Sequence, residues 1–132
     1  MDKKLEENTP IYMQIMHRVQ EAVTSGELAP GDRIPSVREM AADFEVNPNT
    51  MQRALNELER EGLLISERTA GRFVTTNREK IAALKQEAAE CAADTFRREM
   101  EALGFTEEEM MDFFRQRCRN VDSATFEKER IG

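Results

Sequence analysis

Residues 36–61 read SVREMAADFEVNPNTMQRALNELERE, and this stretch predicts two short amphipathic helices separated by a break. Ser36 suits the N-cap of the first helix, and Asn47-Pro48 suits the start of the second, which is predicted over 47–61. Each helix has an apolar stripe at helical spacing, formed by Val37, Met40, Ala41 and Phe44 in the first and by Met51, Ala54, Leu55 and Leu58 in the second. Two helices joined by a turn of three or four residues predict a helix-turn-helix, whose second helix presents its free face outward.

The sequence on either side of this stretch predicts one more helix and a hairpin. Thr9-Pro10 is a typical helix start and Gly26 a typical helix end, so we expect a helix over roughly 10–25. Its apolar stripe would be Ile11, Ile15, Val19 and Val23. Pro30-Gly31 predicts a turn before Ser36. After Gly62 the β-prone runs 63–65 and 73–75 flank residues 67–72, which predicts a hairpin with a basic tip. Directly after a helix-turn-helix, such a hairpin would be a wing.

The remaining sequence predicts two further helices. A long helical segment runs from Asn77 to Leu103, and Gly104 ends it. Thr106 and Glu109 have the spacing of a capping box, which predicts a second helix start. From Asn120 onward no clear period is present, and we expect part of this tail to be disordered. The fold class is therefore mainly α with a small β-hairpin: a winged helix-turn-helix over 1–76, followed by a two-helix dimerisation segment over 77–132.

The expected dimer follows from the small size of the C-terminal segment. Its two helices total about 45 residues and have little apolar surface to bury alone, so they need a partner. A second copy of the chain is the simplest partner, and packing on the chain's own N-terminal half is the alternative. The residues predicted to form the dimer are Ile81, Leu84, Ala88, Phe96, Met110, Phe113 and Phe114.

Composition excludes several classes of function. The 132 residues include 26 acidic and 19 basic side chains, so a net charge of −7 rules out attraction of nucleic acid or lipid by a long-range positive field. No apolar run approaches the roughly 20 residues of a membrane span, and no secretory signal is present, so we expect a cytoplasmic protein. His17 is the single histidine, and Cys91 and Cys118 are expected to be reduced and buried. We therefore expect no enzyme, no cofactor and no bound metal.

Local charge nevertheless permits DNA binding. Residues 1–77 carry nine basic and 13 acidic side chains, yet Arg53 is the one charge between Val46 and Asn56, and residues 68–78 hold three arginines and no acid. The start of a recognition helix enters the major groove, where Asn and Gln can pair with adenine and Arg with guanine. The candidate DNA contacts are Ser36, Arg38, Asn47, Asn49, Thr50, Gln52, Arg53, Asn56, Arg68 and Arg72. A winged helix that binds proteins is the alternative, and it predicts no salt-sensitive DNA binding.

Several fixed spacings in residues 10–75 resemble the GntR-type winged helix-turn-helix regulators. They are Pro10-Ile11-Tyr12 with Gln14-Ile15, the stretch GELAPGDRIPSVRE at 26–39, Val46-Asn47-Pro48-Asn49-Thr50, and Leu58-Glu59-Arg60-Glu61-Gly62. Asn47-Pro48-Asn49-Thr50 followed by Arg53-Ala54, with a short two-helix tail, resembles the YtrA subfamily. That resemblance implies a dimeric repressor, often encoded beside an ABC transporter operon. It also implies DNA contacts from Arg38 and from the start of the third helix.

The chain departs from the family pattern at two places. Many relatives have an arginine where this chain has Pro48, so one expected DNA contact is absent. The wing commonly reads Gly-x-Gly-Thr-Phe-Val in the family, whereas TAGRFV at 69–74 keeps one glycine and gains Arg72. Other subfamilies append a large effector-binding domain, but the 55 residues after Asn77 are too few to enclose a metabolite pocket. A small-molecule effector, if one exists, would bind between subunits or helices.

Overall fold

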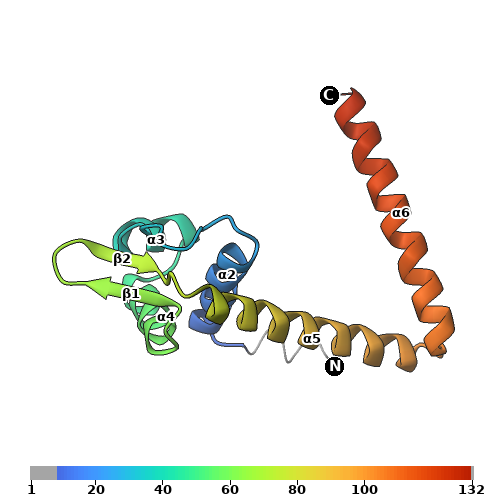
Figure 1. Ribbon diagram of the computed structural model, residues 1–132, viewed down its shortest axis with the longest axis horizontal. Helices are drawn as coiled ribbons and strands as arrows, with labels where there is room; N and C mark the ends of the chain where they lie inside the picture. Colours follow the sequence, from blue (N-terminus) through green and yellow to red (C-terminus); the bar gives the residue numbers. More distant parts are fainter. Residues whose placement is uncertain (1–8, 132) are drawn as a thin grey trace. The chain divides into compact units, whose positions relative to one another are not determined.

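Helices α3 (Val37–Phe44) and α4 (Pro48–Arg60) form the helix-turn-helix in a computed structural model, which describes residues 9–131 and the side chains of residues 9–121 (Figure 1). The other elements are α2 (Ile11–Thr24), β1 (Leu64–Glu67), β2 (Gly71–Val74), α5 (Arg78–Ala102) and α6 (Glu107–Ile131). The described chain is mainly α with one two-stranded hairpin, which confirms the predicted fold class. None of its helices has an apolar run long enough to cross a membrane.

Side chains cap both helices of the helix-turn-helix, as predicted. The Ser36 hydroxyl accepts the Glu39 backbone N–H at 3.2 Å and donates to the Glu39 carboxylate at 3.1 Å. The Asn47 side-chain oxygen accepts the backbone N–H of Asn49 at 2.7 Å, and Pro48 follows as first helical residue. Between the helices, Glu45 adopts a left-handed conformation with φ of 56°, which ends α3. These local bonds set the direction in which α4 leaves the turn.

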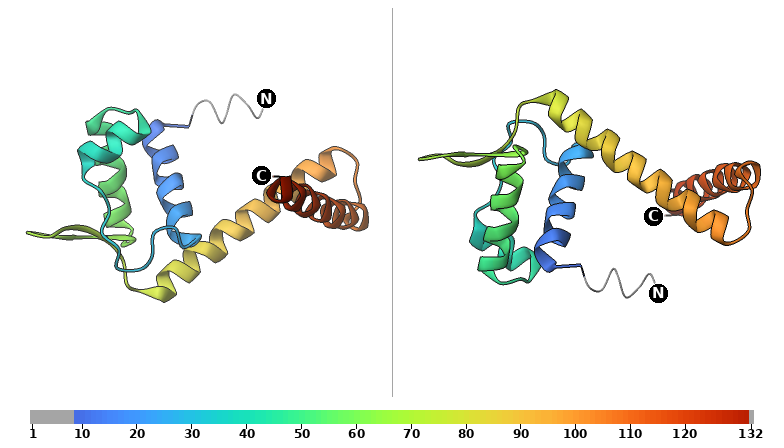
Figure 2. Two further views of the ribbon diagram at one scale, coloured as in Figure 1. Left: turned by 90° about the horizontal axis from the view of Figure 1, so that it is seen from above. Right: turned by 90° about the horizontal axis from the view of Figure 1, so that it is seen from below.

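The core of the N-terminal unit lies among α2, α3, α4 and the base of the hairpin. Helices α2 and α4 run side by side in both views of Figure 2. The core residues are Ile15, Val19, Val23, Ile34, Met40, Ala41, Met51, Ala54, Leu55, Leu58, Leu63, Leu64 and Val74. All four residues of the predicted α4 stripe are fully buried. The α2 stripe is shorter than predicted, because Ile11 is 57% exposed at the first residue of the helix.

The hairpin is held on both sides. Strands β1 and β2 pair antiparallel with Leu64 opposite Val74 and Ser66 opposite Arg72. On the other side of β2 the chain before α3 adds three backbone hydrogen bonds: Gly31 N–H to Val74 O at 2.9 Å, Val74 N–H to Asp32 O at 2.8 Å, and Ile34 N–H to Arg72 O at 3.0 Å. Residues 31–34, which begin within the predicted turn at Gly31, therefore attach the wing to the helix-turn-helix.

The first turns of α5 belong to the N-terminal unit. That unit extends to Gln86, ten residues beyond the predicted boundary at 76, and the second unit begins at Glu87. Ile81 and Leu84 are half-buried and pack against the N-terminal core. These contacts agree with the alternative to dimerisation, in which the segment packs on the chain's own N-terminal half. We therefore leave Ile81 and Leu84 out of the dimer surface proposed below.

The second unit has a small core of its own. Met100 and Met110 are buried, and two aromatic pairs meet edge to face, Phe96 with Phe114 and Phe105 with Phe113, each with ring centroids 5.7 Å apart. The predicted capping box forms: the Glu109 backbone N–H donates to Thr106 Oγ1 at 3.2 Å, and the Thr106 backbone N–H donates to the Glu109 carboxylate at 2.9 Å. The bond from the Thr106 backbone N–H, together with a hydrogen bond from the Thr106 side chain, lowers the pKa of the Glu109 carboxyl.

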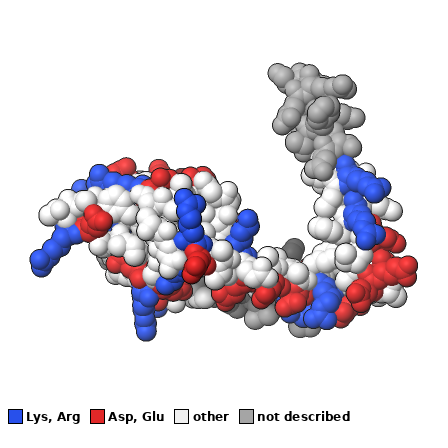
Figure 3. Space-filling model, in the orientation of Figure 1, with Lys and Arg blue, Asp and Glu red and all other residues white. Residues whose placement is uncertain are grey.

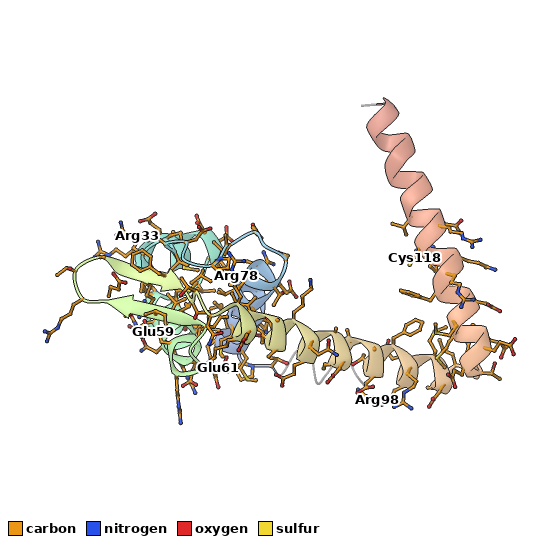
Figure 4. All side chains as sticks on the ribbon, in the orientation of Figure 1. Arg33, Glu59, Glu61, Arg78, Arg98 and Cys118 are labelled. Atoms are coloured by element: carbon orange, nitrogen blue, oxygen red, sulfur yellow. The ribbon has the colours of Figure 1, made fainter. Side chains whose placement is uncertain are left out.

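Two expectations about this unit are wrong. Helix α6 continues through the tail to Ile131, because no glycine or proline interrupts it and each added residue gains a backbone hydrogen bond. Cys91 and Cys118, expected to be buried, are exposed free thiols (Cys118 is labelled in Figure 4). Between Glu87 and Val121, where the side chains are described, only Met100 and Met110 are buried, so this part of the chain has no interior in which to place the two thiols.

Candidate nucleic-acid interface

Helix α4 separates its apolar and polar residues onto opposite faces. The face that bears Met51, Ala54, Leu55 and Leu58 is buried in the core. On the other face Asn49, Arg53 and Asn56 are exposed, and Thr50 and Gln52 are half-buried. The structure therefore gathers on one face all five residues that we expected to contact DNA from the body of this helix. Arg53 is the only charge among them, so no carboxylate at the start of this face would repel an anionic duplex.

Arg53 stacks on an aromatic ring. Its guanidinium carbon lies 3.9 Å from the centroid of the Tyr12 ring, which is contributed by α2. Both side chains line a hollow with Ile11, Asn49 and Thr50. Stacking on a ring face attracts the cation and limits the rotamers of a long side chain. Tyr12 thus holds Arg53 beside the residues at the start of α4.

Arg72 joins the wing to α4. From β2 its Nε donates to the Glu59 carboxylate, and its Nη2 donates to the Asn56 side-chain oxygen at 3.2 Å. The same Glu59 oxygen accepts the hydroxyl of Ser66 in β1. The side chain of Glu59, on α4, accordingly joins that helix to both strands of the hairpin (Figure 4). The expectation placed Arg72 at a basic wing tip, whereas the structure turns its guanidinium back onto the recognition helix.

Glu59 is kept ionised by these contacts. Partial burial alone would raise the pKa of its carboxyl, but hydrogen bonds from Ser66 and Arg72, together with the arginine's charge, lower that pKa below its ordinary value. At neutral pH the carboxylate therefore neutralises Arg72. Much of the wing's formal positive charge is for this reason not available to a phosphate.

The tip of the wing is formed by Arg68, Thr69 and Ala70, between the two strands. Arg68 is exposed, and Figure 3 shows a basic side chain at the free end of the hairpin with acidic side chains elsewhere on this face. Between the hairpin and α3, an open hollow is lined by Arg33, Ser36, Glu39 and Arg72 among others. Arg38 is exposed on α3. Ser36 and Asn47, both expected to contact DNA, use their side-chain oxygens as helix caps.

The fold and this face define a class of protein, a winged helix-turn-helix with a polar recognition helix and an arginine at the wing tip. The family described as "Bacterial regulatory proteins, gntR family" matches residues 11–74. The Bacillus subtilis transcriptional regulator YhcF is 39% identical over 112 residues, which cover 85% of this chain and 93% of YhcF. The chain therefore belongs to the GntR family of DNA-binding transcriptional regulators. The members found are regulators, not enzymes.

Further relatives agree with this assignment. The Bacillus subtilis repressor YtrA is 44% identical over 70 residues, which cover 53% of this chain and 54% of YtrA. A GntR family regulator from Listeria monocytogenes has a similar structure, with a TM-score of 0.77, 34% identity, and coverage of 83% of this chain and 96% of that one. Half of this chain is also similar to the DNA-binding domain of AraR, solved in complex with its operator ORX1, with a TM-score of 0.50 and 30% identity.

Three residues close to the candidate interface were not among the expected DNA contacts: Tyr12, Arg33 and Glu59. Tyr12 was one of the motif residues, but no sequence signal connects it with Arg53. Glu59 was not among the expected site residues, although it anchors Arg72. Arg33 lies next to Gly71, because a Cβ added at Gly71 would come within 3.0 Å of the Arg33 Nε. The sequence signal for Arg33 was its position just before the helix-turn-helix. Among the residues described, no three His, Cys, Asp or Glu side chains group as they would around a metal ion.

Proposed function

We propose that the protein is a repressor that binds an inverted-repeat operator as a homodimer. The observation that supports this most is the polar face at the start of α4, where Arg53 is held by Tyr12 and the wing is tied to the same helix. A recognition helix of this kind reads base edges in the major groove. In a dimer the two recognition helices would meet half-sites about 10 bp apart, or further apart as set by the dimer helices. The protein would act in the cytoplasm, where its operator lies.

Exposed apolar side chains in the second unit support the dimer. They are Leu103, Met111, Phe113, Phe114 and Val121, and each is at least 43% exposed in the single chain. Among the side chains described in this unit, Met100 and Met110 are the only buried ones, so the unit needs further apolar contact to be stable. Phe96, Phe113 and Phe114 remain our proposed dimer residues, with Ala88 exposed on α5, whereas Met110 is buried within the unit itself and is left out of the dimer surface. A two-fold axis would bring two such surfaces together.

The similarity to YtrA, a transcriptional repressor, supports the sign of regulation. The proposed target, an ABC transporter operon, rests on the resemblance of Asn47-Pro48-Asn49-Thr50 and the short tail to the YtrA subfamily. A transporter gene beside the coding gene of this protein would agree with that target.

The direct test is a DNA titration at two salt concentrations. We would follow fluorescence anisotropy of labelled DNA from upstream of the protein's own gene and of a scrambled duplex of equal length. Tight binding to the native fragment, weaker at higher salt and far weaker to the scrambled duplex, is expected for a specific regulator. Equal and weak binding to both duplexes would contradict specific binding there and favour the protein-binding alternative.

Tyr12→Leu is expected to weaken operator binding by about 2- to 5-fold, the factor that an exposed cation–π contact contributes. Without the ring face, Arg53 loses its position and must be ordered when DNA binds. Anisotropy titration of the operator measures the effect. Tyr12→Phe is the matched control, because it keeps the ring and should bind as the unaltered protein does. Unchanged affinity of Tyr12→Leu would show that the stack does not position Arg53.

A further inference from the structure

Asn56 lies in the middle of a chain of hydrogen bonds that crosses from α4 to the wing. Its side-chain oxygen accepts Gln52 Nε2 at 2.8 Å and Arg72 Nη2 at 3.2 Å. Arg72 is in turn bound through Nε to Glu59, and Glu59 also accepts the Ser66 hydroxyl. Four hydrogen bonds thus link three elements, α4, β1 and β2. Two of the five residues, Gln52 and Asn56, are candidate base-reading residues.

The chemistry of arginine settles which end of the Asn56 amide faces the wing. A guanidinium has five N–H donors and no acceptor, so the Asn56 atom that faces Arg72 must be the oxygen. With two donors on it, both lone pairs of that oxygen are occupied. Asn56 is exposed, so its amide nitrogen is the group left for DNA. While these bonds persist, Asn56 can donate to a base but cannot accept from one.

A donor-only asparagine reads bases differently from a free one. A free asparagine pairs with adenine in two bonds, accepting from N6 and donating to N7. A donor-only asparagine can reach N7 and O6 of guanine, N7 of adenine or O4 of thymine, but it finds no acceptor on the major-groove edge of cytosine. The two states of Asn56 therefore predict different base preferences at one position of the operator.

Resting on the proposed operator binding, we propose that Arg72 is a specificity-determining residue that acts through Asn56, because it occupies the amide oxygen and leaves Asn56 to read base acceptors. Glu59 holds Arg72 in place for this purpose. Arg72 is only 17% exposed and Glu59 27%, so little of the guanidinium surface is open to a phosphate. Arg68 is exposed at the tip of the same hairpin, where it can contact the phosphate backbone of DNA. The two wing arginines thus have different tasks.

The test is a base-preference profile of the operator, with each base pair substituted in turn and binding measured by anisotropy. The full chain is used for the unaltered protein and for Asn56→Ala, Arg72→Ala, Arg72→Lys and Arg68→Ala. Asn56→Ala identifies the base pair that Asn56 reads, as the position where its preference disappears. At that position Arg72→Ala is expected to shift the preference toward adenine by about 2- to 12-fold, the factor of one hydrogen bond. The double variant Arg72→Ala/Asn56→Ala should show the same base preference at that position as Asn56→Ala alone.

Arg72→Lys separates the geometry of the side chain from its charge. Lysine keeps the positive charge but lacks the guanidinium fork that donates to Glu59 and Asn56 at the same time. Arg72→Lys should therefore show the same shift in base preference as Arg72→Ala. Arg68→Ala should weaken binding to all sequences equally and reduce the salt dependence, as the loss of a phosphate contact does. Thermal unfolding of each variant, compared with that of the unaltered protein, establishes that the wing is folded.

The outcomes are distinguishable. A uniform loss of affinity in Arg72→Ala, restored by Arg72→Lys and accompanied by a smaller salt slope, would make Arg72 a phosphate contact and overturn the inference alone. A shift confined to the position read by Asn56 supports it. Absence of sequence-specific binding by the unaltered protein would overturn the proposed function, and this inference with it.

Discussion

Phe114→Asp is expected to convert the dimer into a monomer and to weaken operator binding by about 10²- to 10⁴-fold. The ring of Phe114 is 50% exposed in the single chain and lies on Phe96, in the middle of the surface proposed to meet a second subunit. A carboxylate there would have to be desolvated against apolar side chains on dimerisation. Once the subunits separate, each winged helix binds its half-site alone, and the gain from two linked sites is lost.

Sedimentation equilibrium would measure the subunit association, and anisotropy the operator affinity. Phe114→Leu is the matched control, because it keeps an apolar side chain and should remain largely dimeric. Far-UV circular dichroism of both variants checks that α5 and α6 are still helical. If Phe114→Asp stays dimeric with undiminished operator affinity, the dimer uses another surface.

Leu55→Ala is expected to destabilise the N-terminal unit by about 2–5 kcal/mol. Leu55 is fully buried at the middle of α4, and it packs in the core that α2, α3 and the base of the wing share. The truncation leaves a cavity that neighbours on several elements cannot all fill. Since a small domain has only about 5–15 kcal/mol of stability in total, this one change threatens folding and operator binding together.

Urea denaturation followed by circular dichroism would measure the loss in the free energy of unfolding. Leu55→Met, of similar volume, is expected to cost less than about 1.5 kcal/mol. Arg60→Ala is the second control on the same helix. Arg60 is exposed and forms only a surface ion pair with Glu57 at 3.9 Å, so its loss should change stability by less than about 1 kcal/mol. Equal stability of Leu55→Ala and Arg60→Ala would contradict the core described above.

The sequence contained enough local information to predict every element of the winged helix. The caps Ser36 and Asn47 act within two or three residues of the helix starts that they mark. The apolar stripe of α4 is periodic over a single helix, and all of it is buried. Signals of this kind depend on neighbours along the chain, so a single sequence reveals them. The end of α6 was missed because helix propagation needs no periodic stripe.

The polar face of α4 was predictable for the same reason. Asn49, Thr50, Gln52, Arg53 and Asn56 are the polar residues left on α4 once its apolar stripe is assigned to the core. What each residue can do there was not predictable. Arg53 is positioned by Tyr12 from another helix, and the hydrogen-bonding state of Asn56 is set by Arg72 from the wing.

The sequence alone therefore determined the elements, their caps, the buried stripe of α4 and membership in a class of DNA-binding regulators. Only the tertiary structure decided that Arg72 faces Glu59 and Asn56, that residues 31–34 pair with β2, and that Ile81 and Leu84 pack in the N-terminal unit. The physical reason is the range of the interactions. Caps and stripes act between near neighbours in the chain, whereas side chains from separate elements meet only after the core has brought those elements together.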